Sequence, residues 1–188
     1  MKIHCEKVAL EYPTRSGSTQ ALRDVSLSLG ESEFVCLVGP SGCGKSTLLK
    51  LLAGLLDPTT GKVTVNQIPA EDRLPRALVF QDHCVFPWMT VLENVAFGLE
   101  FRSMPRADRH QQALEFIEQV GLGGFAESYP AELSVGMRQR VSLARAFVAK
   151  PQILLMDEPL AALDALTKLI LQEDLLTIWN QDRPLIVY

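Results

Sequence analysis

The sequence has few cysteines and histidines, and this scarcity argues against two kinds of site. The four cysteines are Cys5, Cys36, Cys43 and Cys84, and they form no CxxC pair. The three histidines do not combine with them into the spacing of a metal site. Zinc sites and disulfide frameworks depend on such clusters, so neither is expected. The cysteines are interpreted as buried or incidental thiols.

Long apolar runs are also absent. A membrane-spanning helix needs about 20 apolar residues. The longest uncharged stretches, residues 34–44 and 83–92, are far shorter. Glu6 and Lys7 stand where a signal peptide would have its apolar segment. The sequence therefore predicts a cytoplasmic chain that would reach a membrane only through a partner.

An excess of positive charge is missing as well, because the formal net charge is −4. Nucleic-acid-binding modules usually carry a basic face, so no nucleic acid partner is expected. The one tight basic cluster, Arg138, Arg140 and Arg145, has helical spacing and is interpreted as a solvated or partner-facing helix face. Hydrophobic residues make up 47% and charged residues 21% of the 188 positions, which is typical of a single folded domain.

Apolar runs of strand length alternate with longer segments of helical length. Strands are predicted at residues 3–10, 21–29, 34–38, 61–65, 77–80, 153–156 and 185–188, with a polar turn at 13–19. Helices are predicted at 45–56, 91–101, 104–120, 134–150 and 163–179. Strands and helices alternate at both ends, and helices alone fill the middle. This order predicts an α/β fold with a mainly parallel core sheet and a helical insert.

A glycine-rich segment follows the strand predicted at 34–38 and fits the pattern G-x-x-x-x-G-K-[ST]. Small residues let backbone N–H groups turn toward phosphate oxygens, and the helix that follows offers its positive N-terminal end. The lysine would contact the β- and γ-phosphates, and the serine hydroxyl can ligate Mg²⁺. The segment reads Gly39-Pro40-Ser41-Gly42-Cys43-Gly44-Lys45-Ser46-Thr47.

Two acidic residues, Asp157 and Glu158, directly follow the apolar run at 153–156. The carboxyl end of a buried strand is where α/β sheets form ligand sites. Asp157 is therefore predicted to hold Mg²⁺, and Glu158 to polarise the water that attacks the γ-phosphate. An acidic pair at a strand end is often only the start of a loop, but the phosphate-binding segment upstream favours the catalytic interpretation.

Together these motifs resemble the ATP-binding subunits of ABC transporters. Residues 133–140, Leu-Ser-Val-Gly-Met-Arg-Gln-Arg, are similar to the signature segment of that family. Gln81 matches the Q-loop glutamine, residues 162–164 resemble the D-loop, and Tyr12 stands where the family places an adenine-stacking ring. The resemblance covers essentially the whole chain. Residues 85–95 are similar to the nitrate, sulfonate and taurine importer ATPases in particular.

The resemblance implies a P-loop NTPase fold of the ABC ATPase type. Residues 1–188 would form one domain, with an antiparallel β part at the N-terminus and a helical subdomain at roughly 84–140. The chain would bind and hydrolyse ATP with Mg²⁺, held by Ser46, Gln81 and Asp157, and so power an importer for a small solute.

The same resemblance implies two protein partners. A second ATPase subunit would pack head to tail, so that Ser134 and the N–H of Gly136 approach the nucleotide of the other chain. Asp164 of the D-loop would also belong to the nucleotide site. A membrane permease would bind a groove near His83–Phe97 and hold the chain at the inner face of the cell membrane. The transported solute would be recognised elsewhere.

The chain departs from the family pattern in two places. Val135 stands where the family usually has glycine, which would add bulk beside the γ-phosphate. The sequence stops at Tyr188, before the expected switch histidine, so we expect a C-terminally incomplete domain that hydrolyses ATP poorly but still binds it. Two alternatives stay open: an ATP-binding remnant or regulatory module without useful turnover, and a soluble ABC ATPase that acts on nucleic acid or ribosomes. The second is disfavoured, because such proteins usually carry tandem domains or large insertions.

Overall fold

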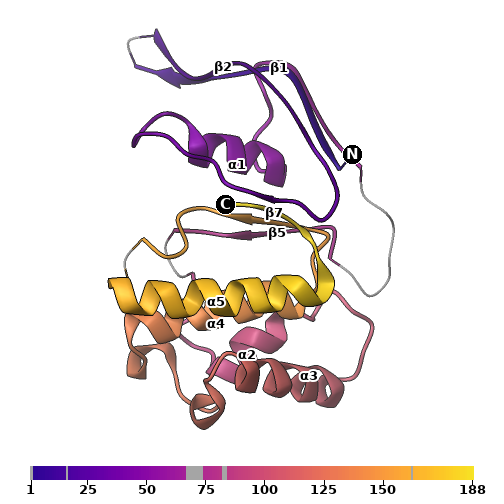
Figure 1. The fold of residues 1–188 in the computed structure, drawn as a ribbon, viewed down its shortest axis with the longest axis vertical. Helices are drawn as coiled ribbons and strands as arrows, with labels where there is room; N and C mark the ends of the chain where they lie inside the picture. The colour runs from indigo at the N-terminus through magenta and orange to yellow at the C-terminus, as the bar shows by residue number, and fades with distance from the viewer. Residues whose placement is uncertain (1, 16, 67–73, 82–83, 162) are drawn as a thin grey trace.

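Two β-sheets and a layer of helices make up the chain (Figure 1). The fold comes from a computed structural model, which describes residues 2–15, 17–66, 74–81, 84–161 and 163–188. The N-terminal sheet is antiparallel and has the order β2 (Gly17–Leu29), β1 (Ile3–Thr14), β4 (Thr60–Val65). Its buried side chains, such as Ile3, Cys5 and Val8, join one core with the leucines of helix α1 (Lys45–Ala53). The predicted antiparallel N-terminal part is therefore confirmed.

The turn between β1 and β2 is shorter than the polar stretch at 13–19 predicts. Pro13 is paired with Ser18, and Thr14 with Gly17, so most of that stretch is strand. Pro13 is tolerated because β1 is paired with β4 only as far as Ala9. Beyond Ala9, β1 has a neighbouring strand on one side only. Proline lacks an N–H, and on the open side of β1 this costs no inter-strand hydrogen bond.

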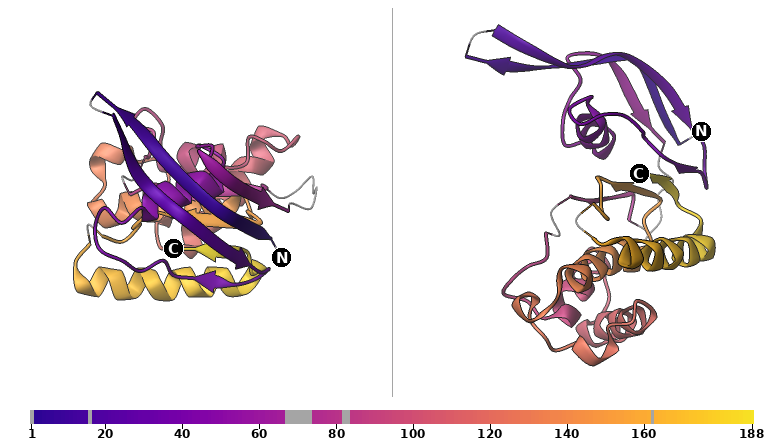
Figure 2. Two further views of the ribbon diagram at one scale, coloured as in Figure 1. Left: turned by 90° about the horizontal axis from the view of Figure 1, so that it is seen from above. Right: turned by 60° about the vertical axis from the view of Figure 1, so that its left-hand side comes forward.

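The second sheet is parallel and has the order β3 (Phe34–Val35), β7 (Leu185–Val187), β6 (Ile153–Met156), β5 (Arg76–Val79). Alternate residues of β6 point to opposite faces. Ile153 and Leu155 share a core with α1, whereas Leu154 and Met156 share one with helices α4 (Val135–Val148) and α5 (Ala165–Asp182). A strand covered on both faces reads as a continuous apolar run, as the sequence of β6 does. Figure 2 shows this layering from two further sides.

Strand β3 is shorter than predicted, ending at Val35 and not at residue 38. Within the described residues it pairs with β7 alone, Phe34 opposite Ile186 and Val35 opposite Val187. One bond continues the contact, because the Leu37 N–H donates to the Tyr188 carbonyl at 2.7 Å.

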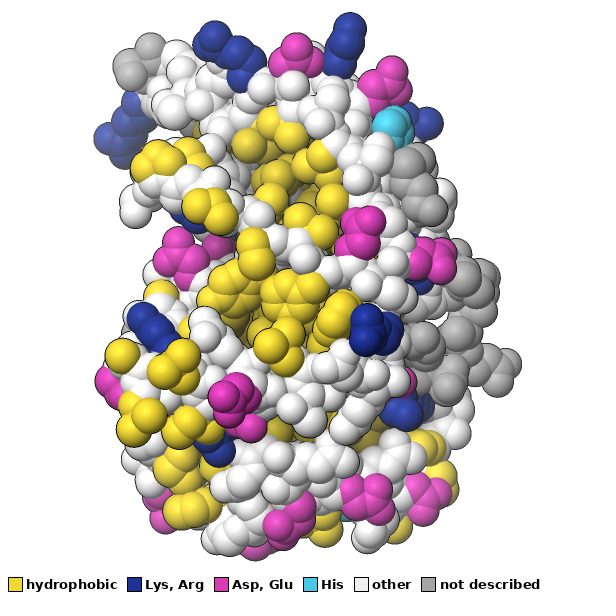
Figure 3. Space-filling model, in the orientation of Figure 1, with side chains coloured by type: hydrophobic (Ala, Val, Ile, Leu, Met, Phe, Trp, Pro, Cys, Tyr) yellow, Lys and Arg dark blue, Asp and Glu magenta, His cyan; other side chains and the backbone are white. Residues whose placement is uncertain are grey.

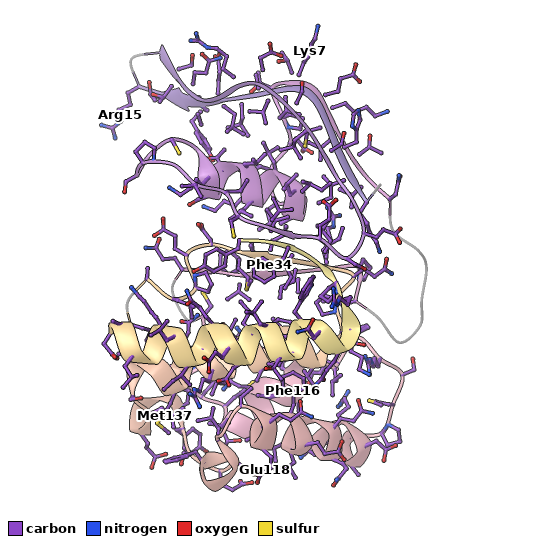
Figure 4. The ribbon with its side chains drawn as sticks, viewed as in Figure 1. Lys7, Arg15, Phe34, Phe116, Glu118 and Met137 are labelled. Atoms are coloured by element: carbon purple, nitrogen blue, oxygen red, sulfur yellow. The ribbon has the colours of Figure 1, made fainter. Side chains whose placement is uncertain are left out.

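Apolar side chains gather on the front face between the N-terminal sheet and α5 (Figure 3). Phe34, labelled there in Figure 4, lies edge-to-face with Trp179 of α5, with 5.7 Å between ring centroids. The indole N–H of Trp179 donates to the Pro184 carbonyl at 2.9 Å. These contacts tie the C-terminal end of α5 to the edge of the parallel sheet.

Helices α2 (Val91–Phe97), α3 (Arg106–Gln119) and α4 enclose a separate core that includes Val95, Ile117 and Val141. Short 3-10 turns at Gly123–Phe125 and Pro130–Glu132 connect α3 to α4. The boundaries predicted for a helical subdomain, roughly 84–140, stay a prediction. No helix within the described ranges is both long enough and apolar enough to cross a membrane.

One buried amide fixes the loop that precedes α2. The side chain of Asn94 is fully buried, and its Nδ2 donates to the carbonyls of Phe86, Met89 and Thr90 at 2.9–3.1 Å. Its Oδ1 accepts from the Phe86 N–H at 2.8 Å. Because every polar atom of this buried side chain has a partner within the loop, residues 86–90 are held in one conformation.

Candidate nucleotide-binding site

The glycine-rich segment forms the loop between β3 and α1, and two of its glycines have backbone angles that side chains disfavour. Gly42 has φ 80° and Gly44 has φ 101°. A Cβ on Gly44 would lie 2.7 Å from the Ala21 carbonyl oxygen and 2.8 Å from a Leu22 methyl group. Glycine at position 44 is therefore required both by the left-handed backbone and by the contact with β2.

Helix α1 begins with uncapped N–H groups. Gly44 is its N-cap and offers no side-chain hydrogen bond, and the first turn carries no acidic residue. The first N–H groups of a helix have no partner within the helix, and they attract anions together with the helix dipole. With a lysine at its first position, this helix end suits a phosphate group.

The Lys45 ammonium contacts three groups at the base of the loop. Nζ donates to the carbonyls of Gly39 at 2.9 Å and Pro40 at 3.1 Å. It also lies 3.8 Å from Oε1 of Glu158. The structure thus brings together the predicted phosphate-binding lysine and the predicted catalytic carboxylate, which are far apart in sequence.

The Ser46 hydroxyl donates to Oδ1 of Asp157 at 2.9 Å. Asp157 is only 9% exposed, and its N–H donates to the Val79 carbonyl of β5 at 2.9 Å. The end of β6 therefore points this carboxylate at the first turn of α1. Two oxygen donors side by side are the ligand type that Mg²⁺ prefers, so the residues present fit this ion.

Glu158 adopts an unusual backbone conformation, with φ 46°. A non-glycine residue in this region carries strain, which proteins often retain at functional sites. Its side chain is 46% exposed. Glu158 therefore faces solvent at the end of β6, where a substrate water can reach it.

A cavity of about 190 Å³ opens beside these groups. Lys45, Asp157 and Glu158 line one side of it. Lys168 and Gln172 of α5 and Tyr188 after β7 also line it, and the sequence motifs do not include these three. Burial raises the pKa of the Tyr188 hydroxyl, and the neighbouring Cys36 and Glu158 act in the same direction.

Three further predicted residues lie on exposed parts of the chain. Tyr12 is partly exposed near the end of β1, and Figure 1 shows that hairpin end and the loop before α1 on the same side. Gln81 is exposed two residues beyond β5, beside the β6 end that carries Asp157. Asp164 precedes α5, and its carbonyl accepts from the Lys168 N–H at 3.0 Å. Ala162 of the predicted D-loop lies outside the described residues.

The signature segment does not join this site within the same chain. Ser134 caps α4, its hydroxyl accepting from the Met137 N–H at 3.2 Å, and Gly136 lies in the first turn. Figure 4 places Met137 below α5, whereas α1 and its preceding loop lie in the upper half. Any contact of Ser134 or Gly136 with a nucleotide would therefore come from another chain.

A larger hollow of about 470 Å³ separates the parallel sheet from the helices. It overlaps only partly with the groove predicted near His83–Phe97, and Asp82 and His83 lie outside the described residues. Its lining comes from β5 and its flanking residues, from the end of α2 and the segment after it, and from α4 and Ala149: Leu74, Arg76, Ala77, Leu78, Phe80, Cys84, Phe97, Gly98, Glu100, Phe101, Ser142, Arg145, Ala146 and Ala149.

The sequence profile of the ABC transporter family matches residues 22–161. The chain belongs to this family. It is 49% identical over 180 residues to the taurine import ATP-binding protein TauB of Burkholderia pseudomallei, covering 95% of this chain and 69% of that protein. It is 44% identical to an uncharacterized ABC transporter ATP-binding protein of Methanocaldococcus jannaschii, covering 100% of this chain and 71% of that protein.

Solved ABC cassettes have the same fold. A dimeric structure of the ABC transporter cassette MJ0796 superposes with a TM-score of 0.85 at 33% identity, covering 98% of this chain and 86% of that one. A post-hydrolysis state of MJ0796 with ADP and Pi gives a TM-score of 0.86 at 34% identity and the same coverage. The predicted ABC ATPase fold and the resemblance to taurine importer ATPases are therefore confirmed, and the chain is an ABC ATP-binding subunit.

Proposed function

We propose that the chain binds and hydrolyses MgATP to power an importer for a small solute of the taurine, sulfonate or nitrate kind. The observation that carries this proposal is the convergence of Lys45, Ser46, Asp157 and Glu158 at one edge of the parallel sheet. The identity to a taurine import protein supports the solute class.

In the proposed mechanism, the N-terminal N–H groups of α1 and the Lys45 ammonium hold the β- and γ-phosphates, while Tyr12 stacks on the adenine. Ser46 and Asp157 would hold Mg²⁺, with Gln81 beyond β5 approaching from the neighbouring strand end. The bound ion would neutralise charge that develops on the phosphates. Phosphate binding competes for Lys45 and so releases Glu158, which then accepts a proton from the attacking water.

The proposed assembly has two ATPase subunits packed head to tail. Each would place Ser134, the Gly136 N–H and Asp164 against the nucleotide of the other. The separation of α4 from the phosphate-binding loop supports this arrangement. A membrane permease would bind the hollow beside α2 and α4 and so hold the subunit on the cytoplasmic face of the membrane.

A second candidate function is ATP binding without useful turnover. Val135 favours it, because its side chain is 40% exposed at the N-terminus of α4, on the surface that would approach the γ-phosphate of the other subunit. A bulky residue there would weaken the closed dimer, which the proposed hydrolysis requires.

MgATP hydrolysis measured over a range of protein concentrations separates the two functions, with Glu158→Gln as the control. Turnover above the control that rises faster than linearly with concentration supports a dimeric ATPase. Turnover equal to the control, together with retained ATP binding, supports the binding module. Loss of ATP binding in the unaltered chain would exclude both.

A further inference from the structure

The α1–β4 hollow, a space of about 430 Å³, lies at the C-terminal end of α1. Its walls are the end of α1 with the segment that follows, strand β4 and the start of β5. Leu51, Leu56, Val63 and Val65 line it with apolar side chains that also pack in the core of the N-terminal sheet. Pockets for small molecules measure roughly 300–1,000 Å³ and combine apolar walls with a few polar groups, so this hollow has the size and lining of such a site.

The guanidinium of Arg76 lines the α1–β4 hollow and is held at the end of α1. Nη1 donates to the Leu52 carbonyl at 3.0 Å, where a cation also complements the negative end of the helix dipole. The group lies against the backbone of Gly54, since a Cβ there would be only 3.0 Å from Nη1. A guanidinium carries five N–H donors, and within the described residues the Leu52 carbonyl is the only acceptor for this one. Arg76 is therefore fixed in position with donors left for a ligand.

Two further charged side chains line the hollow, Lys62 of β4 and Asp57 in the segment before it. Neither forms an ion pair or a side-chain hydrogen bond within the parts of the chain that the structure describes. The segment that carries Asp57 is tied to β1, because the Thr59 N–H donates to the Ala9 carbonyl at 2.8 Å and the Thr59 hydroxyl accepts from the Glu11 N–H at 3.0 Å. The two cations and the acid are thus attached to walls that are already in place.

These charges discriminate between classes of ligand. An inorganic phosphate would suit Arg76 and Lys62 but would be repelled by Asp57, and a metal cation would be repelled by the two basic side chains. A molecule with both an acidic group and an ammonium group satisfies all three side chains. We propose that the α1–β4 hollow binds a small zwitterion, an amino acid or an aminosulfonate, whose acidic group contacts Arg76 and Lys62 and whose ammonium contacts Asp57.

The proposed site is separate from the candidate nucleotide site. Among the described residues, none lines both the α1–β4 hollow and the cavity beside Glu158. Helix α1 stands between them, since it begins at the glycine-rich loop and ends at the hollow. Its 9 residues correspond to about 14 Å of helix. A zwitterion would therefore bind without displacing ATP, and its binding does not depend on hydrolysis.

The test titrates the isotope-labelled full chain with matched small probes and follows binding by NMR. Taurine and β-alanine carry both charges, ethanesulfonate and propionate lack the ammonium, and ethylamine lacks the acid. Each zwitterion should bind about tenfold more tightly than the probes with one charge, because a hydrogen bond to a charged group contributes about that factor. The tighter of the two zwitterions identifies the acidic group that the site prefers.

Substitutions assign the contacts. Lys62→Gln and Asp57→Asn change side chains without bonds in the described chain, so both variants should fold normally. Lys62→Gln should weaken the zwitterions and the acids several-fold, and Asp57→Asn should remove the advantage of taurine over ethanesulfonate. Arg76→Gln should weaken every acidic probe about tenfold. Arg15→Gln, at the turn between β1 and β2 (Figure 4), is the matched control and should change none of the affinities.

Equal affinity for each zwitterion and its counterpart without the ammonium would overturn the proposal, as would binding of none of the probes. An advantage of the zwitterions that survives Asp57→Asn would overturn it too, because the ammonium would then contact another residue. If Arg76→Gln does not fold, the Lys62 and Asp57 variants still decide. ATP binding is measured on the same samples, so that normal ATP binding without probe binding counts against the α1–β4 hollow alone and not against the proposed ATPase.

Discussion

The ammonium of Lys45 lies 3.8 Å from the carboxylate of Glu158, so the proposed phosphate-binding cation and the proposed general base partly neutralise each other. Lys45 also donates to the carbonyls of Gly39 and Pro40. In the proposed mechanism, the γ-phosphate displaces Glu158 from Lys45. That displacement would link substrate binding to the release of the base.

Replacement of Glu158 by glutamine should abolish hydrolysis and slightly tighten ATP binding, because a competing anion is removed. The gain should be at most about fivefold, since the pair is partly exposed and such pairs contribute at most about 1 kcal/mol. Equilibrium titration with a fluorescent ATP analogue at low and high salt checks this, and the gain should shrink at high salt. Weaker ATP binding by the glutamine variant would contradict the proposed competition.

Replacement of Ser46 by alanine should make nucleotide binding less sensitive to Mg²⁺, because one of the proposed ligands of the ion is removed. It should also lower the free energy of unfolding by about 1 kcal/mol, because the buried Asp157 loses its hydroxyl partner. Titrations with and without Mg²⁺, together with urea unfolding, measure the two effects. Ser46→Thr is the control and should restore both, since it keeps the hydroxyl. An unchanged Mg²⁺ response in Ser46→Ala would remove Ser46 from the ion's ligand set.

The residues of the candidate nucleotide site are predictable from sequence where they belong to contiguous motifs. Lys45 and Ser46 follow a glycine pattern, and Asp157 follows an apolar strand, so each can be found without knowledge of the packing. Lys168 and Gln172 cannot, because they line the cavity only through the way α5 lies on the sheet. Periodicity gives little help there, since α5 keeps Leu166 and Leu169 exposed while Leu171 and Leu175 are buried.

The fold shows the same division between local pattern and tertiary pairing. Strand β6 is predicted with its observed bounds, because four apolar residues between polar neighbours mark both ends of the strand. The hairpin of β1 and β2 extends through Pro13 because pairing in three dimensions overrides the local turn signal.

Replacement of Gly44 by alanine should destabilise the fold by about 1–3 kcal/mol, because the residue must adopt a left-handed conformation. The new methyl group would also press on the Ala21 carbonyl and so shift the loop that receives the phosphates. Urea unfolding and ATP titration should therefore both report a loss. Gly124→Ala is a matched control, since a Cβ at Gly124 meets nothing within 4 Å, and it should change neither quantity. Equal stability of the two variants would refute the steric argument.

Replacement of Val135 by glycine should have opposite effects on the monomer and on the proposed dimer. At the first position of α4, glycine is less favourable than valine by roughly 0.3–0.5 kcal/mol, so the monomer should unfold slightly more easily. Removal of the exposed isopropyl group should let the N-terminus of α4 approach the γ-phosphate of a second subunit more closely. ATP-dependent dimerisation should then become stronger, although the folded chain itself is weaker.

Analytical ultracentrifugation with MgATP measures this best in a Glu158→Gln background, where hydrolysis does not disperse the dimer. Val135→Ala serves as the intermediate control, because it shortens the side chain but keeps the helix propensity high. Dimerisation should increase in the order valine, alanine, glycine, because the side chain becomes smaller in that order. Helix stability does not follow this order, so it would not explain the result. If all three variants dimerise equally, Val135 does not face the second nucleotide, and the second candidate function loses the observation that favours it.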